Sequence, residues 1–256
     1  MSAVFDALAD DYDRHFSHSP VGRRMRAVTW QRCDALFAPG SSVLEINCGT
    51  GEDAVHLAAR GVRVTATDAS PAMVAVAEAK ITAASLAADV TVRCMPIESI
   101  DVSLGSFDGL LSNFGGLNCV EDLRATALQL AAVVRPGGVA LLNVMGPLVP
   151  WEWAWFLAHG DRRRAFRRLH RGGAAWRGAT IRYPSPATLR RAFAPAFTVT
   201  RIAGLGALLP PPFAESWARR HSRATDWLDR IEQAARDFAR DCNAVAKPRQ
   251  NAQGNS

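Results

Sequence analysis

The sequence predicts an α/β fold built on a doubly wound, mainly parallel sheet. Between residues 42 and 145, short apolar and β-branched stretches alternate with longer stretches rich in alanine and leucine. Such alternation is typical of parallel strands joined by crossover helices. Glycine and proline separate most of these stretches, which supports the division into elements. A chain of 256 residues fits one such domain, and we expect it to cover residues 1–247.

Residues 1–40 are expected to form an N-terminal helical cap. Apolar side chains recur at helical spacing over residues 3–16, and a second helical pattern covers about 21–37. A His-Ser-Pro sequence interrupts the helix between them, because proline does not continue it.

The elements that follow are bounded by residues with clear local roles. Gly61 is suited to end a helix in the left-handed conformation, and Ser70-Pro71 provides a helix cap and a first-turn proline. We expect strands at 42–46, 62–67, 90–93, 107–112 and 139–145, and helices at about 52–60, 71–87 and 119–134. Further along, we expect a strand at about 197–203, a proline loop at 205–213, a helix at about 214–240, a last strand at 242–247 and a disordered tail at 248–256.

Composition argues against several classes of protein. Lys and Arg outnumber Asp and Glu by 30 − 24 = 6, which is basic without being extreme. No apolar run approaches the ~18 residues of a membrane span, and the N-terminus is acidic, so we expect a cytoplasmic protein. Five scattered cysteines without a Cys-x-x-Cys pair favour neither a disulfide framework nor a structural zinc site.

The segment from Glu45 to Gly51 is the most informative about function. A strand, a glycine turn and a helix in this order let the backbone approach a nucleotide, although a tight turn without a ligand uses the same residues. Glu52 and Asp53 stand where a pyrophosphate would bind at the helix N-terminus, which argues against a dinucleotide. Asp68 ends the next strand, where an acidic residue suits a ribose diol. The implied ligand has a ribose, a positive charge for Glu45 and no phosphate, and S-adenosylmethionine (SAM) has these features.

The chain resembles class I SAM-dependent methyltransferases, of the type 11 and type 25 groups, in four successive motifs: VLEINCGTGED, VTATDASPAMV, FDGLLSNFGGLNCV and RPGG. These motifs follow the family's order and spacing over about residues 40–145. The resemblance implies a seven-stranded, Rossmann-like sheet with a reversed last strand. It also implies that SAM is the cofactor and that S-adenosylhomocysteine is the product. No metal is expected, because no set of carboxylates follows the fourth predicted strand.

The resemblance also assigns cofactor-binding residues. Asn47 replaces the family's usual first glycine, and asparagine tolerates the left-handed conformation that this turn needs. The acidic residue that often meets the adenine amine is missing. We therefore expect apolar contacts and a backbone hydrogen bond from Ile97, with Glu98 as an alternative. The implied cofactor-binding residues are Tyr12, Glu45, Asn47, Cys48, Gly49, Gly51, Asp68, Ala69, Met73, Pro96, Ile97 and Asn113.

Fewer residues define the acceptor side. Asn113 and Phe114 follow the fourth strand, where the family places residues that face the substrate. The Asn-Pro-Pro-Tyr motif of many amine and amide methylases does not continue after Asn113, which counts against methylation of nucleic-acid bases or glutamine. Asn118 is expected to cap the following helix. No base is assigned, and His15, His18 and Asn113 are the candidates for a catalytic role, since aligned methyl transfer needs a base only for a protonated acceptor.

The insertion at residues 147–183 is longer than a connection between strands requires. Tryptophans at 151, 153 and 155 precede six arginines between residues 162 and 171. Extra chain at the carboxyl end of a sheet commonly covers the ligand cleft, so we expect a helical substrate lid in which Trp153 and Trp155 contact the acceptor. The alternative is a helix that packs its tryptophans on the core and leaves its arginines in water. In the lid interpretation, the arginines meet an acidic substrate, a carrier protein or an anionic membrane surface through residues 151–171.

Together these observations predict a SAM-dependent methyltransferase that methylates a small molecule, with oxygen as the expected acceptor atom, in secondary metabolism or cofactor modification. The acceptor is expected to be aromatic or anionic, no stable nucleic-acid partner is expected, and the protein is expected to be a monomer or homodimer. Three alternatives stay open: a small-molecule amine N-methyltransferase, an RNA methyltransferase and a SAM-binding protein without turnover. An RNA enzyme would bind RNA with a steep salt dependence.

Overall fold

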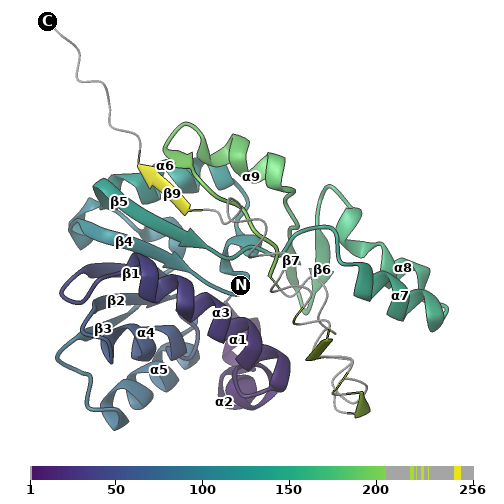
Figure 1. The fold of residues 1–256 in the computed structure, drawn as a ribbon, viewed down its shortest axis with the longest axis horizontal. Coiled ribbons are helices and arrows are strands. Elements are labelled where there is room, and N and C mark those ends of the chain that lie inside the picture. Colours follow the sequence, from purple (N-terminus) through teal and green to yellow (C-terminus); the bar gives the residue numbers. More distant parts are fainter. Residues whose placement is uncertain are drawn as a thin grey trace, which may run out of the picture.

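The computed structural model describes residues 2–205, 220, 221, 223, 226, 227, 230 and 245–248. Its strands are β1 (Ser42–Ile46), β2 (Arg63–Asp68), β3 (Val90–Cys94), β4 (Phe107–Ser112), β5 (Val134–Leu142), β6 (Ala174–Trp176), β7 (Ala179–Ile181), β8 (Phe197–Val199) and β9 (Val245–Pro248). The main sheet has the order β3-β2-β1-β4-β5-β9-β8. Strands β1 to β5 run parallel to their neighbours, whereas β9 is antiparallel to both β5 and β8. The predicted mainly parallel sheet is confirmed (Figure 1).

Helices cover both faces of this sheet. The α-helices are α1 (Ser2–Asp6), α2 (Ala9–Tyr12), α3 (Pro20–Leu36), α4 (Glu52–Ala58), α5 (Pro71–Ala83), α6 (Leu123–Val133), α7 (Pro150–Ala158), α8 (Arg162–Ala165) and α9 (Pro186–Phe193). Shorter turns are the π-helix η1 (Asp13–Ser17) and the 3-10 helices η2 (Ile97–Ser99), η3 (Val102–Leu104), η4 (Gly116–Cys119) and η5 (Arg167–Leu169). One buried cluster joins α3, α4 and α5 to one face, and a second joins α6 and α9 to the other. Because strand side chains alternate between faces, Val43 belongs to the first cluster and Leu44 to the second.

Strand β1 lies at the point where the sheet changes its direction of growth. It pairs with β2 on one side and with β4 on the other. In open α/β sheets, ligands bind in the crevice beyond the carboxyl ends of the strands at such a point. The last four residues of β1 are buried, which anchors the following loop to the centre of the fold.

The N-terminal cap is more broken than the sequence predicts. In place of one helix over residues 3–16, the chain forms α1, α2 and the π-helical η1. Aspartates near the breaks bind the body of the domain. Asp6 accepts a hydrogen bond from the Ser70 hydroxyl, and Asp13 accepts one from the Lys80 ammonium. These long-range contacts replace the continuity of a single helix.

The insertion begins with α7 and α8 and ends in a β-hairpin that was not predicted. β6 and β7 pair antiparallel, and Arg177 and Gly178 between them have φ of 47° and 90°. Two positive φ values are typical of a two-residue hairpin turn, which an Asn-Gly or Asp-Gly pair usually signals. An arginine in the first position obscures that signal. Figure 1 shows β6 and β7 between the body of the domain and the projecting α7 and α8.

One predicted helix starts later than expected. The helix expected at 119–134 is α6, which begins at Leu123. Its cap is Asp122, whose carboxylate accepts hydrogen bonds from two amides of the first turn. The prediction that Asn118 caps this helix is therefore wrong.

Several predictions near the C-terminus lie largely outside the described residues. These are the proline loop at 205–213, the helix at 214–240 and the tail at 248–256. Strand β9 covers part of the last strand predicted at 242–247. Within the described part of the chain, no helix has both the length and the apolar character needed to cross a bilayer.

Candidate functional site

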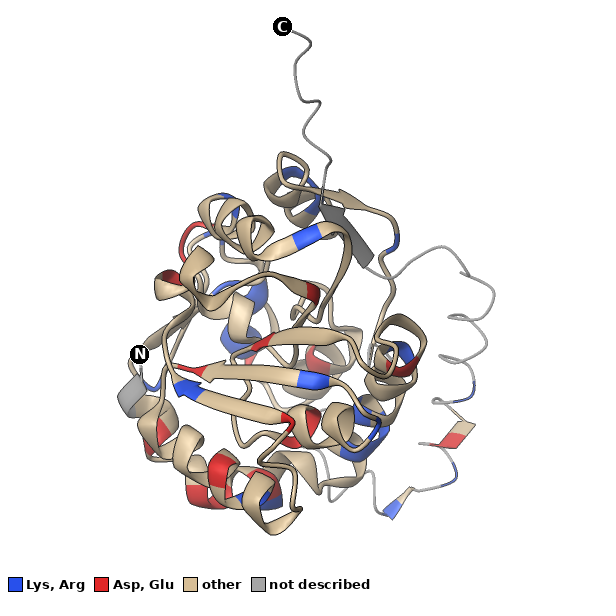
Figure 2. Ribbon diagram, turned by 90° about the vertical axis from the view of Figure 1, so that its left-hand side faces the viewer, with Lys and Arg blue, Asp and Glu red and all other residues tan. Residues whose placement is uncertain are grey.

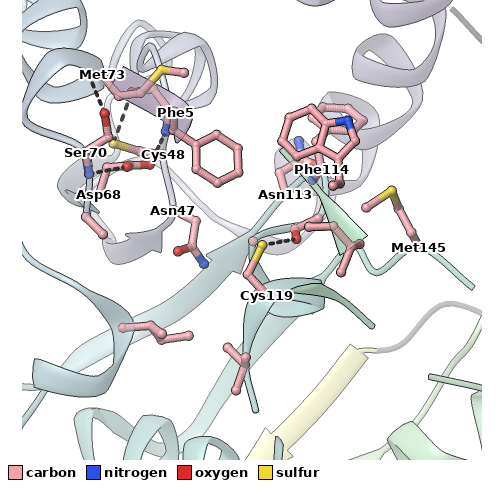
Figure 3. Close-up of a pocket in the computed structure, with 18 of the residues that line it drawn as sticks. Phe5, Asn47, Cys48, Asp68, Ser70, Met73, Asn113, Phe114, Cys119 and Met145 are labelled. Carbon is pink, nitrogen blue, oxygen red and sulfur yellow. Dashed lines mark hydrogen bonds between the residues drawn. The ribbon is translucent and has the colours of Figure 1, made fainter. Parts of the chain in front are cut away.

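A cavity of about 470 Å³ lies beyond the carboxyl ends of β1, β2 and β4. Small-molecule sites enclose roughly 300–1,000 Å³. One part, the loop half, is bounded by the loop after β1, the start of α5 and the turn after β3. The other part, the insertion half, is bounded by the loop after β4, by Met145 and by residues 167–183. Figure 3 shows Asn47 and Asp68 on one side and Phe114 and Met145 on the other.

The loop after β1 is left-handed at three positions. Asn47, Gly49 and Gly51 have φ of 56°, 55° and 77°, so Asn47 adopts the conformation expected of it. An added Cβ on Gly51 would lie 2.9 Å from the Cβ of Ala77. Gly51 therefore permits close packing of α4 on α5, and it does not line the cavity. Gly49 does line it, and an added Cβ there would meet no atom within 4 Å.

Asp68 ends β2 and lines the loop half. Its Oδ2 accepts a hydrogen bond from the Gly49 amide and its Oδ1 accepts one from the Ser70 amide, both at 2.9 Å. Burial raises the pKa of Asp68, and the backbone hydrogen bonds limit that rise. Each carboxylate oxygen keeps a lone pair for a further donor. The side chain can therefore accept hydrogen bonds from hydroxyls of a bound ligand.

Other predicted cofactor residues line the same half: Tyr12, Cys48, Ala69, Met73 and Ile97. Glu98, the alternative at the adenine end, lines it as well, whereas Pro96 does not. Phe5 of α1 adds a ring that was not predicted to contact the cofactor. Burial raises the pKa of Tyr12 to about 12, although the nearby Arg26 cation opposes the rise, so the phenol keeps its proton.

Glu45 is buried in β1 and does not line the cavity. Burial raises its pKa well above the usual value, and the neighbouring Asp53 carboxylate adds to the rise. The Oε2 atom of Glu45 has no hydrogen-bond partner among the described residues. The structure thus places this carboxyl behind the cavity wall.

A buried ion pair in the cavity wall was missed by sequence reasoning. Arg26 Nη1 and Trp30 Nε1 both donate to Asp53 Oδ1 at 2.7 Å, and Asn113 Nδ2 donates to Asp53 Oδ2 at 2.8 Å. The Arg26 guanidinium also covers the Phe114 ring, 4.8 Å from its centroid. Burial opposes the charge of Arg26, yet the Asp53 carboxylate raises the pKa of Arg26 on balance, so the guanidinium stays charged. No sequence spacing signals this pairing, because α3 and α4 meet only in the folded chain.

Of the candidates for a catalytic role, only Asn113 lines the cavity. Its amide is held at both ends, since Nδ2 donates to Asp53 and Oδ1 accepts from Asn143 Nδ2 at 2.8 Å. This arrangement suits a residue that positions the wall. His15 is exposed on η1 and His18 is exposed directly after it, and no histidine of the described residues lines the cavity.

An acidic cluster beside the loop half has a structural explanation. Asp13, His18 and Glu52 place ligand atoms within 4.8 Å of one another. The Lys80 ammonium lies 2.6 Å from both Asp13 Oδ2 and Glu52 Oε1. Because this cation bridges the two carboxylates, the cluster fastens η1 to α4 and α5.

The aromatic residues of the insertion half differ from those expected. Trp153 and Trp155 pack against other rings of the insertion, and neither lines the cavity. Trp176 of β6 and Tyr183 after β7 line it instead, together with the predicted Phe114. The hairpin, and not α7, provides the aromatic wall.

Two of the six arginines also reach the cavity. Arg167 Nη2 donates to Oε1 of the buried Glu152 at 3.0 Å, and Arg168 Nε donates to its Oε2 at 2.9 Å. The Arg168 guanidinium covers the Tyr183 ring, 4.8 Å from its centroid. Two cations share one carboxylate, so this wall has one excess positive charge.

Asn118 joins the elements that surround the insertion half. It is fully buried, and its Oδ1 accepts a hydrogen bond from the Met145 amide at 2.9 Å. Its Nδ2 donates to the carbonyls of Met145 and Arg182. The side chain thereby ties the loop after β4 to the segments that follow β5 and β7.

Comparisons with known proteins agree with this fold. A family model described as a methyltransferase domain matches residues 43–138. A malonyl-[acyl-carrier protein] O-methyltransferase from Serratia marcescens is 31% identical over 205 residues, which are 75% of each chain. A ubiquinone/menaquinone biosynthesis C-methyltransferase, UbiE, from Geotalea daltonii is 32% identical over 151 residues, and this match covers 56% of the present chain and 63% of the relative. The cyclopropane synthase MmaA2 from Mycobacterium tuberculosis shares the fold, with a TM-score of 0.60, 16% identity and 95% of both chains covered.

The chain therefore belongs to the class I family of SAM-dependent methyltransferases, and its cofactor is SAM. The residues of the loop half fit this cofactor. Gly49 leaves open space on the cavity side, and Asp68 keeps acceptor capacity for ribose hydroxyls. Asn47 Nδ2 is buried and has no partner in the described chain, so it can donate to a bound ligand. These three residues would hold the cofactor.

Proposed function

We propose that the protein transfers a methyl group from SAM to an ionised oxygen of a small-molecule acceptor. This proposal rests mainly on one observation. A single cavity contains both the loop half, which fits SAM, and the insertion half, which is lined by aromatic residues and arginines. When bound, SAM supplies a methyl group on a positively charged sulfur. The acceptor oxygen forms the new C–O bond as the C–S bond breaks, and S-adenosylhomocysteine is released.

The carboxylates of the cavity wall support an acceptor that arrives as an anion. Asp53 already accepts hydrogen bonds from Arg26, Trp30 and Asn113, which occupy both of its carboxylate oxygens. Asp68 is engaged by backbone amides and is assigned to the ribose. Glu98, the third carboxylate of the lining, lies at the adenine end of the loop half. None of the three is placed to remove a proton from the acceptor. An oxygen ionised at neutral pH needs no such base. Carboxylates and acidic enols or phenols meet this condition.

The charge of the opposite wall supports the same choice. Arg167 and Arg168 share the single carboxylate of Glu152, which leaves one positive charge to attract an anion. A protonated amine would be repelled at this wall. This difference favours O-methylation over the amine N-methyltransferase alternative.

The shape of the insertion half favours an acceptor with a flat apolar part. Phe114, Trp176 and Tyr183 supply rings, and Met145 supplies a flexible thioether. Aromatic walls of this kind bind planar groups by offset stacking and edge contacts. We therefore place an aromatic or other unsaturated acid among the first acceptors to test.

Carbon methylation is a second candidate, because one matched relative is named a C-methyltransferase of quinone biosynthesis. A phenolate can react at its oxygen or at a neighbouring ring carbon. Both reactions use the same anionic acceptor and the same cavity. Nuclear magnetic resonance of the methylated product distinguishes an O-methyl from a C-methyl group.

The test begins with calorimetry of SAM and S-adenosylhomocysteine binding, followed by methyl transfer from methyl-labelled SAM to matched aromatic carboxylates, phenols and amines. We expect turnover of acids and acidic phenols. Arg167→Gln should raise KM for these acceptors by about tenfold, since a charge-assisted hydrogen bond is worth roughly 1.5–3 kcal/mol. Arg171→Gln is the matched control, because this neighbouring arginine is exposed and does not line the cavity.

Other outcomes would assign another function. Faster turnover of amines than of acids would contradict the charge argument. Methylation of RNA with a steep salt dependence would establish the RNA alternative. Tight SAM binding without methylation of any acceptor would support a SAM-binding protein without turnover.

A further inference from the structure

Exposed apolar side chains of the described chain are concentrated in the insertion. Leu148, Leu157, Phe166, Leu169 and Trp176 are 64%, 42%, 41%, 49% and 40% exposed. Single exposed apolar residues are ordinary on a protein surface, but a group of them on one projecting element marks an interaction site. Leu148 precedes α7, Leu157 lies in α7, Phe166 and Leu169 lie around η5, and Trp176 lies in β6. Figure 1 shows α7 and α8 projecting from the body of the domain, with β6 on the side toward the body.

The exposed charges of the same segment are predominantly basic. Arg162, Arg163, Arg164, Arg171 and Arg177 are exposed. The two acidic residues of the insertion are engaged within it. Glu152 is buried beneath two arginines, and Asp161 accepts a hydrogen bond from the Arg164 amide at 2.9 Å. Elsewhere on the fold, acidic and basic residues are interspersed (Figure 2).

We propose that this apolar basic surface, formed by the exposed residues of 157–177, docks on an anionic lipid bilayer. Leucine, phenylalanine and tryptophan beside arginine is the composition of segments that lie in a membrane interface. The rings and aliphatic side chains enter the boundary of the acyl chains, while the guanidinium groups bind lipid phosphates. An acidic protein partner could bury the same side chains, and binding to a carrier protein is therefore compared with binding to vesicles.

The surface is continuous with the mouth of the cavity. Trp176 lines the insertion half and is also exposed, and Arg177 covers its ring at 5.5 Å. Docking would therefore turn the insertion half of the cavity toward the lipid. An acceptor with an apolar body in the bilayer and an acidic group at the bilayer surface could then enter the cavity. The idea that the acceptor enters from the lipid rests on the proposed function. Membrane binding itself can be measured without any methyl transfer.

The test is sedimentation of the full chain with vesicles of phosphatidylcholine alone or of phosphatidylcholine mixed with phosphatidylglycerol. We expect binding to the anionic vesicles, with weaker binding at higher salt because exposed charges are screened. The double variant Arg162→Gln/Arg163→Gln should bind about thirtyfold more weakly, since each charge removed costs about fivefold in affinity. Arg190→Gln/Arg191→Gln is the matched control, since these adjacent arginines of α9 are also exposed. It should bind like the unchanged protein.

A second pair of variants tests the apolar contribution. Leu157→Ser/Leu169→Ser should weaken vesicle binding, whereas Val102→Ser/Leu128→Ser removes exposed apolar side chains elsewhere and should not. Unchanged SAM affinity in calorimetry shows that each variant is folded. Absence of binding to anionic vesicles, or equal losses in test and control pairs, would overturn the proposal. Salt-sensitive binding to an acidic carrier protein in place of vesicles would also overturn it and would assign the surface to a protein partner.

Discussion

The loop half and the insertion half of the cavity are built from different kinds of contact. In the loop half, backbone geometry over a short stretch does most of the positioning, as in the hydrogen bond from the Gly49 amide to Asp68. In the insertion half, residues distant in sequence position the wall, as when Asn118 binds the carbonyl of Arg182. In the proposed function, residues of a short sequence motif therefore bind the cofactor that the whole family shares. The acceptor, which differs between proteins, is bound by residues that only the tertiary structure brings together.

Among variants that distinguish the two halves of the cavity, Gly49→Val in the loop half is expected to have the largest effect, which is a loss of SAM binding. A branched side chain would project into the open space of the loop half, so measurable SAM binding should be lost. The left-handed φ of 55° adds a cost to stability of about 1–2 kcal/mol, which leaves the protein folded. Calorimetry with SAM measures the first effect and thermal unfolding measures the second.

The control for this variant is Gly49→Ala, which shares the backbone strain but adds one methyl group. It should retain part of the SAM affinity while losing a similar amount of stability. Circular dichroism that showed Gly49→Val to be unfolded would mean that the residue is needed for the turn alone. In that case the glycine loop would give no information about the cofactor.

A smaller effect is expected in the insertion half for Trp176→Ala. Loss of this ring should raise KM for the acceptor about tenfold, because an aromatic contact is worth roughly 0.5–1.5 kcal/mol beyond its buried area. Trp155→Ala is the matched control, since Trp155 stacks on His159 and does not line the cavity. It should lower the melting temperature and leave KM unchanged. Steady-state kinetics with an acceptor found in the turnover screen compares the two variants.

Because Trp176 also contacts Phe5 in the loop half, SAM affinity is measured in parallel. We expect little change, since Phe5 is held by α1 against α5. Equal losses of SAM affinity and acceptor affinity would remove the distinction between the halves. A larger effect of Trp155→Ala than of Trp176→Ala would restore the expectation that α7 forms the acceptor wall.

The same contrast explains which features could be predicted from the sequence. The parallel strands β1 to β5 and the loop after β1 follow from alternating apolar stretches and from Gly49 and Asp68, whose roles depend on nearby residues. The pairing of Arg26 with Asp53 was missed, because only the packing of α3 on α4 brings them together. A helix cap could not be assigned from Asn118 alone, since Asp122 offers the same chemistry.

The insertion shows a further limit of sequence patterns. Alternating tryptophans indicate a buried face but not what covers it, and Trp153 packs against Phe166 within the insertion. The hairpin that supplies Trp176 was hidden because arginine occupies a turn position that usually favours asparagine or glycine. Likewise, the run of arginines did not indicate that two of them, Arg167 and Arg168, would form ion pairs with the buried Glu152.

The smallest effect concerns Glu45, which lies behind the wall of the loop half. Its pKa in the folded chain is raised well above 4.5, so the folded state holds its proton at pH values where the unfolded state has released it. The free energy of unfolding should therefore fall as pH rises from about 4.5 through the folded-state pKa. Glu45→Gln has no proton to release, so this fall should be missing and the variant should be about 1 kcal/mol more stable at neutral pH. Urea unfolding of both proteins between pH 5 and 8 measures the difference. Identical pH profiles would mean that the Glu45 carboxyl is not buried without a partner in the folded chain.

Because Glu45 stands behind the wall, the substitution should also weaken SAM binding less than Asp68→Asn does. A larger loss for Glu45→Gln would instead bring this carboxyl into direct contact with the positive charge of the cofactor, as the sequence predicts.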